Sequence, residues 1–159
     1  MALLTIKHSS INSGNPVFIQ AKGFSATYNK KSMADPNANY SEDTPVVRVQ
    51  SKNLENPVYT IIGVVLYDSG DTIKGYTALT VDLLKDFLVL ANDDSDPIIL
   101  NYTDDNSINY SSLQKYSGSR TTDIPVTMNN QVKVDSEIDS SRAKLLTVST
   151  LLFTETKKV

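Results

Sequence analysis

The segment at residues 57–68, PVYTIIGVVLYD, constrains the fold more than any other part of the chain. Nearly every position is apolar or β-branched, so an extended strand here would be apolar on both faces. A strand of this kind belongs in the middle of a sheet, because each face needs a covering layer. Gly63 interrupts the run and indicates a bulge, a bend or a close approach of another backbone.

Shorter β-branched runs flank this segment and predict a mainly β fold of about eight strands. The expected strands are residues 3–7, 16–22, 45–50, 57–68, 98–103, 124–128, 131–138 and 143–156. Pro125 cannot donate a ladder hydrogen bond, so the run at 124–128 is expected at a sheet edge. Residues 51–56 are expected to form a turn, and Val132, Val134 and Ile138 are expected to face inward.

One segment, TVDLLKDFLVLA at residues 80–91, has a helical period instead. Thr80 is the expected N-cap, and an apolar stripe through Leu84 and Leu88 is wide enough to cover a sheet. The predicted fold is therefore a β-sandwich or small barrel flanked by one α-helix. A length of 159 residues fits a single domain spanning residues 1–159.

A polar stretch at residues 28–44, YNKKSMADPNANYSEDT, carries almost no aliphatic side chains. Loops of this length are uncommon in compact domains unless they are functional or disordered. It is either a loose surface loop or a polar arm that orders against a neighbouring subunit. Aromatic and methionine side chains suit interfaces, and the candidate contact residues of the polar arm are Tyr28, Met33, Asp35 and Tyr40.

Composition excludes several classes of function. The chain has no cysteine and therefore no disulfide or thiolate site. A net charge of −3 and the lack of a long basic run argue against sequence-specific nucleic-acid binding. The apolar stretch at the N-terminus is too short for a signal peptide, and no apolar run is long enough to span a membrane. The expectation is a soluble protein made in a cytoplasm.

Candidate chemical groups are sparse. His8 is the sole histidine and lies beside a terminal strand, with no nucleophile motif around it. Acidic residues cluster at Asp93, Asp94 and Asp96, and again at 104–105, without the glycine and closing glutamate of a calcium loop. The sequence therefore predicts no enzyme activity, no metal site and no cofactor.

The order of these parts resembles the tail tube proteins of long-tailed bacterial and archaeal viruses, and the related tube proteins of contractile injection machines. The segments that carry the resemblance are residues 28–44, 45–50, 57–68, 80–91, 131–138 and 143–156. The resemblance spans most of the chain and is architectural. The part most similar to such proteins is NPVYTIIGVVLYD followed closely by TVDLLKDFLVLA.

This resemblance implies a structural protein of the virion tail that is assembled in the host cytoplasm. Six copies would form a ring, stacked rings would form a tube, and hairpins from every copy would join into one inner barrel through which DNA passes. The partners would be other copies of this chain and other tail proteins, and the protein would not bind a membrane. The polar arm would contact the next ring. The shared-sheet candidates are Tyr59, Ile61, Gly63, Val65, Val148 and Leu152.

Two physical features agree with the resemblance. Strands that are apolar on both faces need more covering than one subunit easily supplies, and assembly would also remove exposed strand edges. An acidic chain suits a channel that does not retain DNA. The main alternative is a carbohydrate- or receptor-binding β-sandwich, with Tyr102, Tyr110 and Tyr116 on its binding face. A small hydrolase on a β scaffold is a third.

Overall fold

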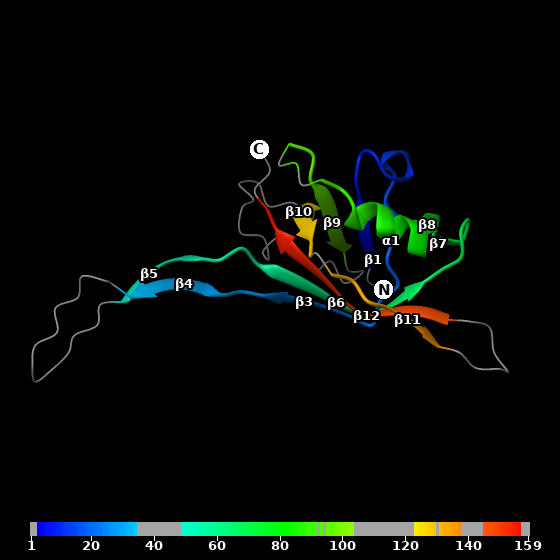
Figure 1. The fold of residues 1–159 in the computed structure, drawn as a ribbon. Helices are drawn as coiled ribbons and strands as arrows, with labels where there is room; N and C mark the ends of the chain where they lie inside the picture. Colours follow the sequence, from blue (N-terminus) through cyan, green and yellow to red (C-terminus); the bar gives the residue numbers. More distant parts are fainter. Residues whose placement is uncertain are drawn as a thin grey trace, which may run out of the picture.

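The computed structural model describes residues 3–34, 49–91, 93, 95–103, 123–129, 131–137 and 145–156. Within these residues the chain forms twelve strands, one α-helix and one 3-10 turn (Figure 1). The expectation of a mainly β fold with one helix is confirmed, although the sheet is not closed into a barrel. The helix is α1 (Val81–Leu88) and the turn is η1 (Asn12–Gly14). The strands are β1 (Leu3–Lys7), β2 (Val17–Phe18), β3 (Gly23–Thr27), β4 (Lys30–Ala34), β5 (Val49–Leu54), β6 (Val58–Leu66), β7 (Thr72–Ile73), β8 (Tyr76–Ala78), β9 (Ile98–Thr103), β10 (Asp123–Met128), β11 (Val134–Glu137) and β12 (Leu145–Glu155).

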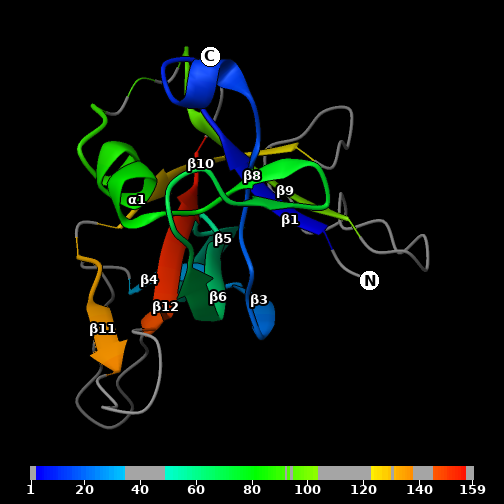
Figure 2. The same ribbon diagram turned by 90° about the vertical axis from the view of Figure 1, so that its right-hand side faces the viewer.

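Ten strands form one sheet that folds over on itself. Its order is β3-β6-β12-β10-β9-β1-β2-β8-β7, and β11 pairs with the other end of β12. The ladder between β10 and β12 is short, running from Val126 opposite Glu155 to Met128 opposite Phe153. The sheet bends at this short ladder, so that β11, β12, β6 and β3 form one layer and the remaining strands lie over it (Figures 1 and 2).

The core fills the space between these two layers. Each large apolar side chain buried there contributes roughly 1.5–3 kcal/mol to folding. The helix α1 adds Leu84 and Phe87 to the same core. The largest fully buried side chains include Tyr59, Ile61, Leu100, Ile124, Leu151 and Phe153.

The two longest strands change which face they bury halfway along. Tyr59 and Ile61 point into the core before Gly63, and Val64 points into it afterwards, so two successive positions face outward. Gly63 makes this possible with a φ of +68°, which other residues rarely adopt. β12 changes phase at the same level, because Val148 pairs with Val64 and Leu151 pairs with Ile61.

The helix begins where the sequence predicts. The Thr80 side chain accepts a hydrogen bond of 3.2 Å from the Leu83 amide, which satisfies one of the free donors at the helix N-terminus. Asp82 lies in the first turn, near the positive end of the helix dipole. The last helical residue is Leu88, three residues before the predicted end.

Several boundaries differ from expectation. β5 covers Val49–Leu54, so the turn expected at 51–56 is wrong for residues 51–54. The expected strand at 16–22 is only β2, and β3 follows it without a clear sequence signal. β10 is not an edge strand, because it lies between β9 and β12. On its β12 side, Pro125 lies just beyond the end of β12, where the Pro125 carbonyl accepts a hydrogen bond from the Thr156 amide. A proline, which has no amide hydrogen to donate, is therefore tolerated there.

Candidate functional site

The four-strand layer, β11-β12-β6-β3, has an open edge on each side. Among the described strands, β3 pairs with β6 alone and β11 pairs with β12 alone. All three ladders inside the layer are antiparallel. An unpaired edge presents a row of free backbone donors and acceptors, which is a template for another strand. The layer therefore has two edges that are both able to accept a strand.

These two edges are staggered along the strand direction. β3 is centred opposite Thr60 of β6, whereas β11 lies at the level of Val65. The levels differ by five residues, which corresponds to roughly 17 Å at about 3.3 Å per residue. The layer is therefore slanted rather than rectangular.

The shared-sheet candidates divide between the two faces of the layer. Tyr59, Ile61 and Val148 are fully buried in the core of one copy. Val65 and Leu152 are half-buried and point to the opposite face, which we call the far face. The segment at residues 57–68 is expected to need neighbouring subunits to cover both of its faces. This is wrong for most of β6, because the change of phase buries Tyr59 and Ile61 before Gly63 and Val64 and Leu66 after it. Ile62 is the large apolar side chain of β6 that stays exposed, at 48%.

The far face is rich in hydroxyl groups. Its charged side chains include Lys133 and Asp135, which form an ion pair with 3.7 Å between Lys133 Nζ and Asp135 Oδ1. Lys22 is also charged, and the stem of its side chain lies across Gly63. Uncharged polar and apolar groups dominate the rest of this surface. The hydroxyl side chains are Ser25, Thr27, Thr60, Thr147, Ser149, Thr150 and Thr154.

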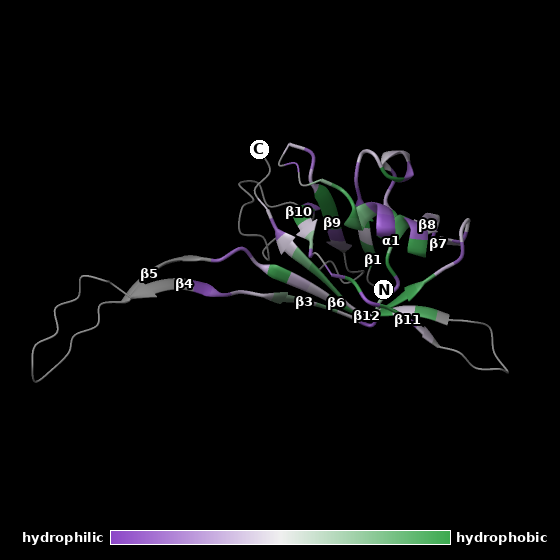
Figure 3. Cartoon of the chain, viewed as in Figure 1, coloured by the Kyte–Doolittle hydropathy of each residue, from purple (hydrophilic) through white to green (hydrophobic). Residues whose placement is uncertain are grey.

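The β4–β5 hairpin continues the β3–β6 ladder beyond the layer. The amide of Glu55 donates to the Asn29 carbonyl at 2.7 Å, which links the two ladders. Figure 1 shows this hairpin extending away from both layers, and Figure 3 shows that its base is hydrophilic. β4 and β5 pair only with each other among the described strands.

The polar arm coincides with the first strand of this hairpin and with residues beyond it. Tyr28 lies at the hairpin base and is 42% exposed. Met33 lies in β4, and its side chain is outside the described residues, as are Asp35 and Tyr40. The structure therefore places one of the four candidates in full.

A buried acid lies beside the hairpin base. Glu155, at the end of β12, is fully buried, and its amide donates to the Pro57 carbonyl at 3.0 Å. Burial raises the pKa of Tyr59, and the nearby Glu155 carboxylate raises it further. Burial and then Glu155 raise the pKa of Tyr28 in the same way. Glu155, Tyr59 and Tyr28 thus form one electrostatically coupled group where the hairpin leaves the layer.

The single histidine is part of a polar cluster between the β1–η1 turn and the segment before β9. Its Nδ1 accepts from the Ser10 amide at 3.2 Å and lies 2.8 Å from the Ser10 hydroxyl. The proton therefore belongs on Nε2, which donates to the Asp96 carbonyl at 3.0 Å. In a serine hydrolase Nε2 takes the serine proton and a carboxylate holds Nδ1–H, so His8 has the opposite arrangement. The cluster is better explained as a link between two turns.

The acidic residues before β9 also serve local structure. Asp93 accepts from the amide and the hydroxyl of Ser95, and these hydrogen bonds lower the pKa of Asp93. Asp94 lies outside the described residues, as do residues 104–105. Among the described residues, no group of three histidine or acidic side chains could hold a metal ion.

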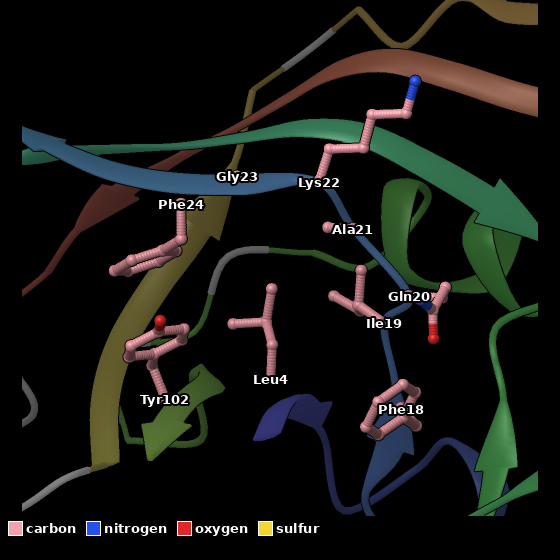
Figure 4. A pocket seen from close by; sticks show the side chains of 9 residues that line it. All are labelled: Leu4, Phe18, Ile19, Gln20, Ala21, Lys22, Gly23, Phe24 and Tyr102. Carbon is pink, nitrogen blue, oxygen red and sulfur yellow. The ribbon is translucent and has the colours of Figure 1, made fainter. Parts of the chain in front are cut away.

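A pocket of about 200 Å³ opens beside β3 (Figure 4). Phe24 and Tyr102 stack at its wall with ring centroids 4.6 Å apart, and Phe24 also stacks with Tyr59 at 5.9 Å. We call this the aromatic pocket. Its lining residues are Leu4, Phe18, Ile19, Gln20, Ala21, Lys22, Gly23, Phe24 and Tyr102.

The sequence does not reveal the aromatic pocket or the open edge of β3. The residues of β3, GFSAT, are too short and too small to give a strand signal, and Tyr102 is expected instead on the alternative binding face. Tyr110 and Tyr116 of that face lie outside the described residues. Val134 is expected to face inward, and its strand partner Val148 does, but Val134 itself is 40% exposed.

Comparison with protein-family models and with curated proteins finds no match to this chain. Among the described residues, no helix is long and apolar enough to cross a membrane. The features of the described residues that bear on function are the four-strand layer, its edges and the β4–β5 hairpin.

Proposed function

We propose that this chain is a structural subunit that assembles into rings, which stack to form the tail tube of a long-tailed virus. It assembles in the host cytoplasm, contacts other tail proteins and encloses a channel for DNA without reading its sequence. Its role is architectural and not enzymatic. The observation that carries the proposal is the four-strand layer, whose two outer strands have no further partner among the described strands.

The two edges are suited to head-to-tail pairing. Because the layer has four alternating strands, β11 of one copy would run antiparallel to β3 of the next, as the strands do inside each copy. Head-to-tail contacts between identical subunits generate a ring when the rotation closes. Ring closure removes all the open edges of the layer, which are otherwise a liability for aggregation.

The stagger between the edges matches the geometry of a barrel. Each subunit would add four strand spacings, about 19 Å, around the barrel, and it shifts the edge by roughly 17 Å along the strands. The strands would then tilt by about 40° from the tube axis, within the range usual for closed barrels. A six-membered ring fits the resemblance given above.

The β4–β5 hairpin supports stacking of the rings. An isolated two-stranded hairpin is marginally stable in water and needs further strands or a packing surface. Within one copy, the described strands provide neither. A hairpin that leaves the layer along the strand direction would run along the tube wall, inclined to the tube axis like the strands. It would reach an adjacent ring and find its packing surface there.

The far face would line the channel. The sequence predicts that net acidity keeps DNA from adhering, but the described residues of this face carry mainly hydroxyl groups. A surface with few unpaired cations releases few counterions from DNA, so it binds DNA weakly at physiological salt.

Sedimentation velocity and negative-stain microscopy over a range of protein concentrations test the proposal. We expect rings or tubes with a central hole. Deletion of residues 35–42 is expected to leave rings and folding intact while preventing stacking. A compact monomer at every concentration would refute the proposal, and unchanged tubes after the deletion would refute the role of the polar arm.

A further inference from the structure

Val134 occupies an unusual position on the open edge of β11. It pairs with Val148, which is fully buried, so the Val134 side chain points to the core side of the layer. It nevertheless remains 40% exposed, because it lies beyond the rim of the core. Its neighbours Lys133 and Asp135 point to the far face and bond with each other. An apolar side chain is thus presented from an open edge.

The aromatic pocket lies on the same side of the layer at the opposite edge. Phe24 pairs with Ile61, which is fully buried, so Phe24 also points to the core side. Figure 4 shows Leu4, Ile19 and Phe24 around the open space, with the Lys22 side chain pointing away from it. Among the nine lining residues, only Gln20, Lys22 and Tyr102 have a polar group in the side chain.

We propose that Val134 of one copy inserts into the aromatic pocket of the next copy. This inference rests on the head-to-tail pairing proposed above. If β11 lies beside β3, the core-facing side chains of the two strands become neighbours, as they are within a sheet. Val134 then contacts Phe24, and the cores of adjacent copies form one continuous apolar layer.

The size and chemistry of the pocket favour this occupant. An apolar cavity of about 150 Å³ accepts a molecule as large as benzene, so a pocket of about 200 Å³ accepts a valine side chain. Small-molecule sites usually add several convergent polar groups to an apolar wall. Here the polar side chains of the lining are Gln20, Lys22 and the Tyr102 hydroxyl, and Lys22 points away.

Val134→Asp tests the inference, and Val89→Asp is the matched control. Val89 is also an exposed valine, at 79%, but it lies at the end of α1, away from both edges. We expect Val134→Asp to raise the concentration needed for half-assembly at least about tenfold, because a carboxylate must enter an apolar pocket. Val89→Asp should assemble like the parent chain. Circular dichroism melting checks that both variants fold.

A proximity measurement decides the case even if Val134→Asp folds poorly. The chain has no cysteine, so a Val134→Cys chain can be mixed with an Ala21→Cys chain without background thiols. We expect a mixed disulfide between two chains under assembly conditions, and none when Val89→Cys replaces Val134→Cys. If the parent chain assembles but neither result appears, this inference fails alone. If the parent chain does not assemble, the proposed function fails with it.

Discussion

Gly63→Ala should destabilise the subunit, because Gly63 combines two constraints. Its φ is +68°, and a Cβ there would lie 2.9 Å from both Cγ and Cδ of Lys22. The left-handed conformation costs a non-glycine residue about 1–2 kcal/mol. Displacing the Lys22 stem adds roughly 1 kcal/mol, at the low end for overpacking, because the stem is flexible. We expect a loss of about 2–3 kcal/mol in the free energy of unfolding.

Urea and thermal unfolding of the monomer measure this loss. For a chain of this length, it corresponds to a fall in Tm of roughly 5–10 °C. Gly70→Ala is the control, because Gly70 has a φ of +90° and a Cβ there would meet no atom within 4 Å. Gly63→Ala should be the more destabilising of the two, and Lys22→Ala should reduce the difference in a double-mutant cycle. Equal effects at both glycines, unchanged by Lys22→Ala, would refute the close-approach argument.

Three further perturbations test other parts of the molecule. Thr80→Ala should cost about 1 kcal/mol of stability through loss of the helix cap, whereas Thr72→Ala, at an exposed position, should cost little; urea unfolding compares them. The pKa of Tyr59 is raised in the folded state, so the unfolded chain loses the Tyr59 hydroxyl proton first as pH rises past 10.0. The free energy of unfolding should therefore fall above that pH. Tyr59→Phe should lessen the alkaline fall, and equal slopes for both proteins would contradict the assignment. Thr150→Lys on the far face should make assembled tubes retain DNA at low salt, while Ser69→Lys in an exposed turn should not; a DNA co-sedimentation series in salt distinguishes them.

The sequence predicts the elements whose periodicity is strong. The runs that form β1, β6, β9 and β12 have long or regular apolar patterns, and α1 has a clear stripe with a capping threonine. Element type follows from such patterns because side-chain direction repeats every two or every 3.6 residues. The short strands β3, β4 and β5 are not predictable in this way. Their residues are held by pairing with another strand, β6 for β3 and each other for β4 and β5, and not by local preference.

The sites are less predictable for a related reason. Gly63 is identifiable from the sequence as an irregular point in its strand, and the structure has a φ of +68° there. The close neighbour of Gly63 is the Lys22 side chain, however, and not the expected second backbone. The change of buried face across Gly63 cannot be read from the pattern, because alternation in sequence assumes a strand without interruption. The aromatic pocket joins Leu4, Phe24 and Tyr102 from three strands, and its formation depends on how the sheet folds over.

Cross-linking between the two open edges decides whether β3 of one copy lies beside β11 of another. Ser25→Cys and Asp135→Cys in one chain place thiols on the far face at the two edges. Within a copy these positions are separated by three strand spacings and about five residues, roughly 20 Å, whereas a disulfide requires Cα atoms within about 7 Å. We predict that oxidation, or a short bismaleimide that tolerates a difference in register, links successive copies into a ladder ending at the closed ring. Cross-linked products no larger than those of either single variant would contradict edge-to-edge assembly.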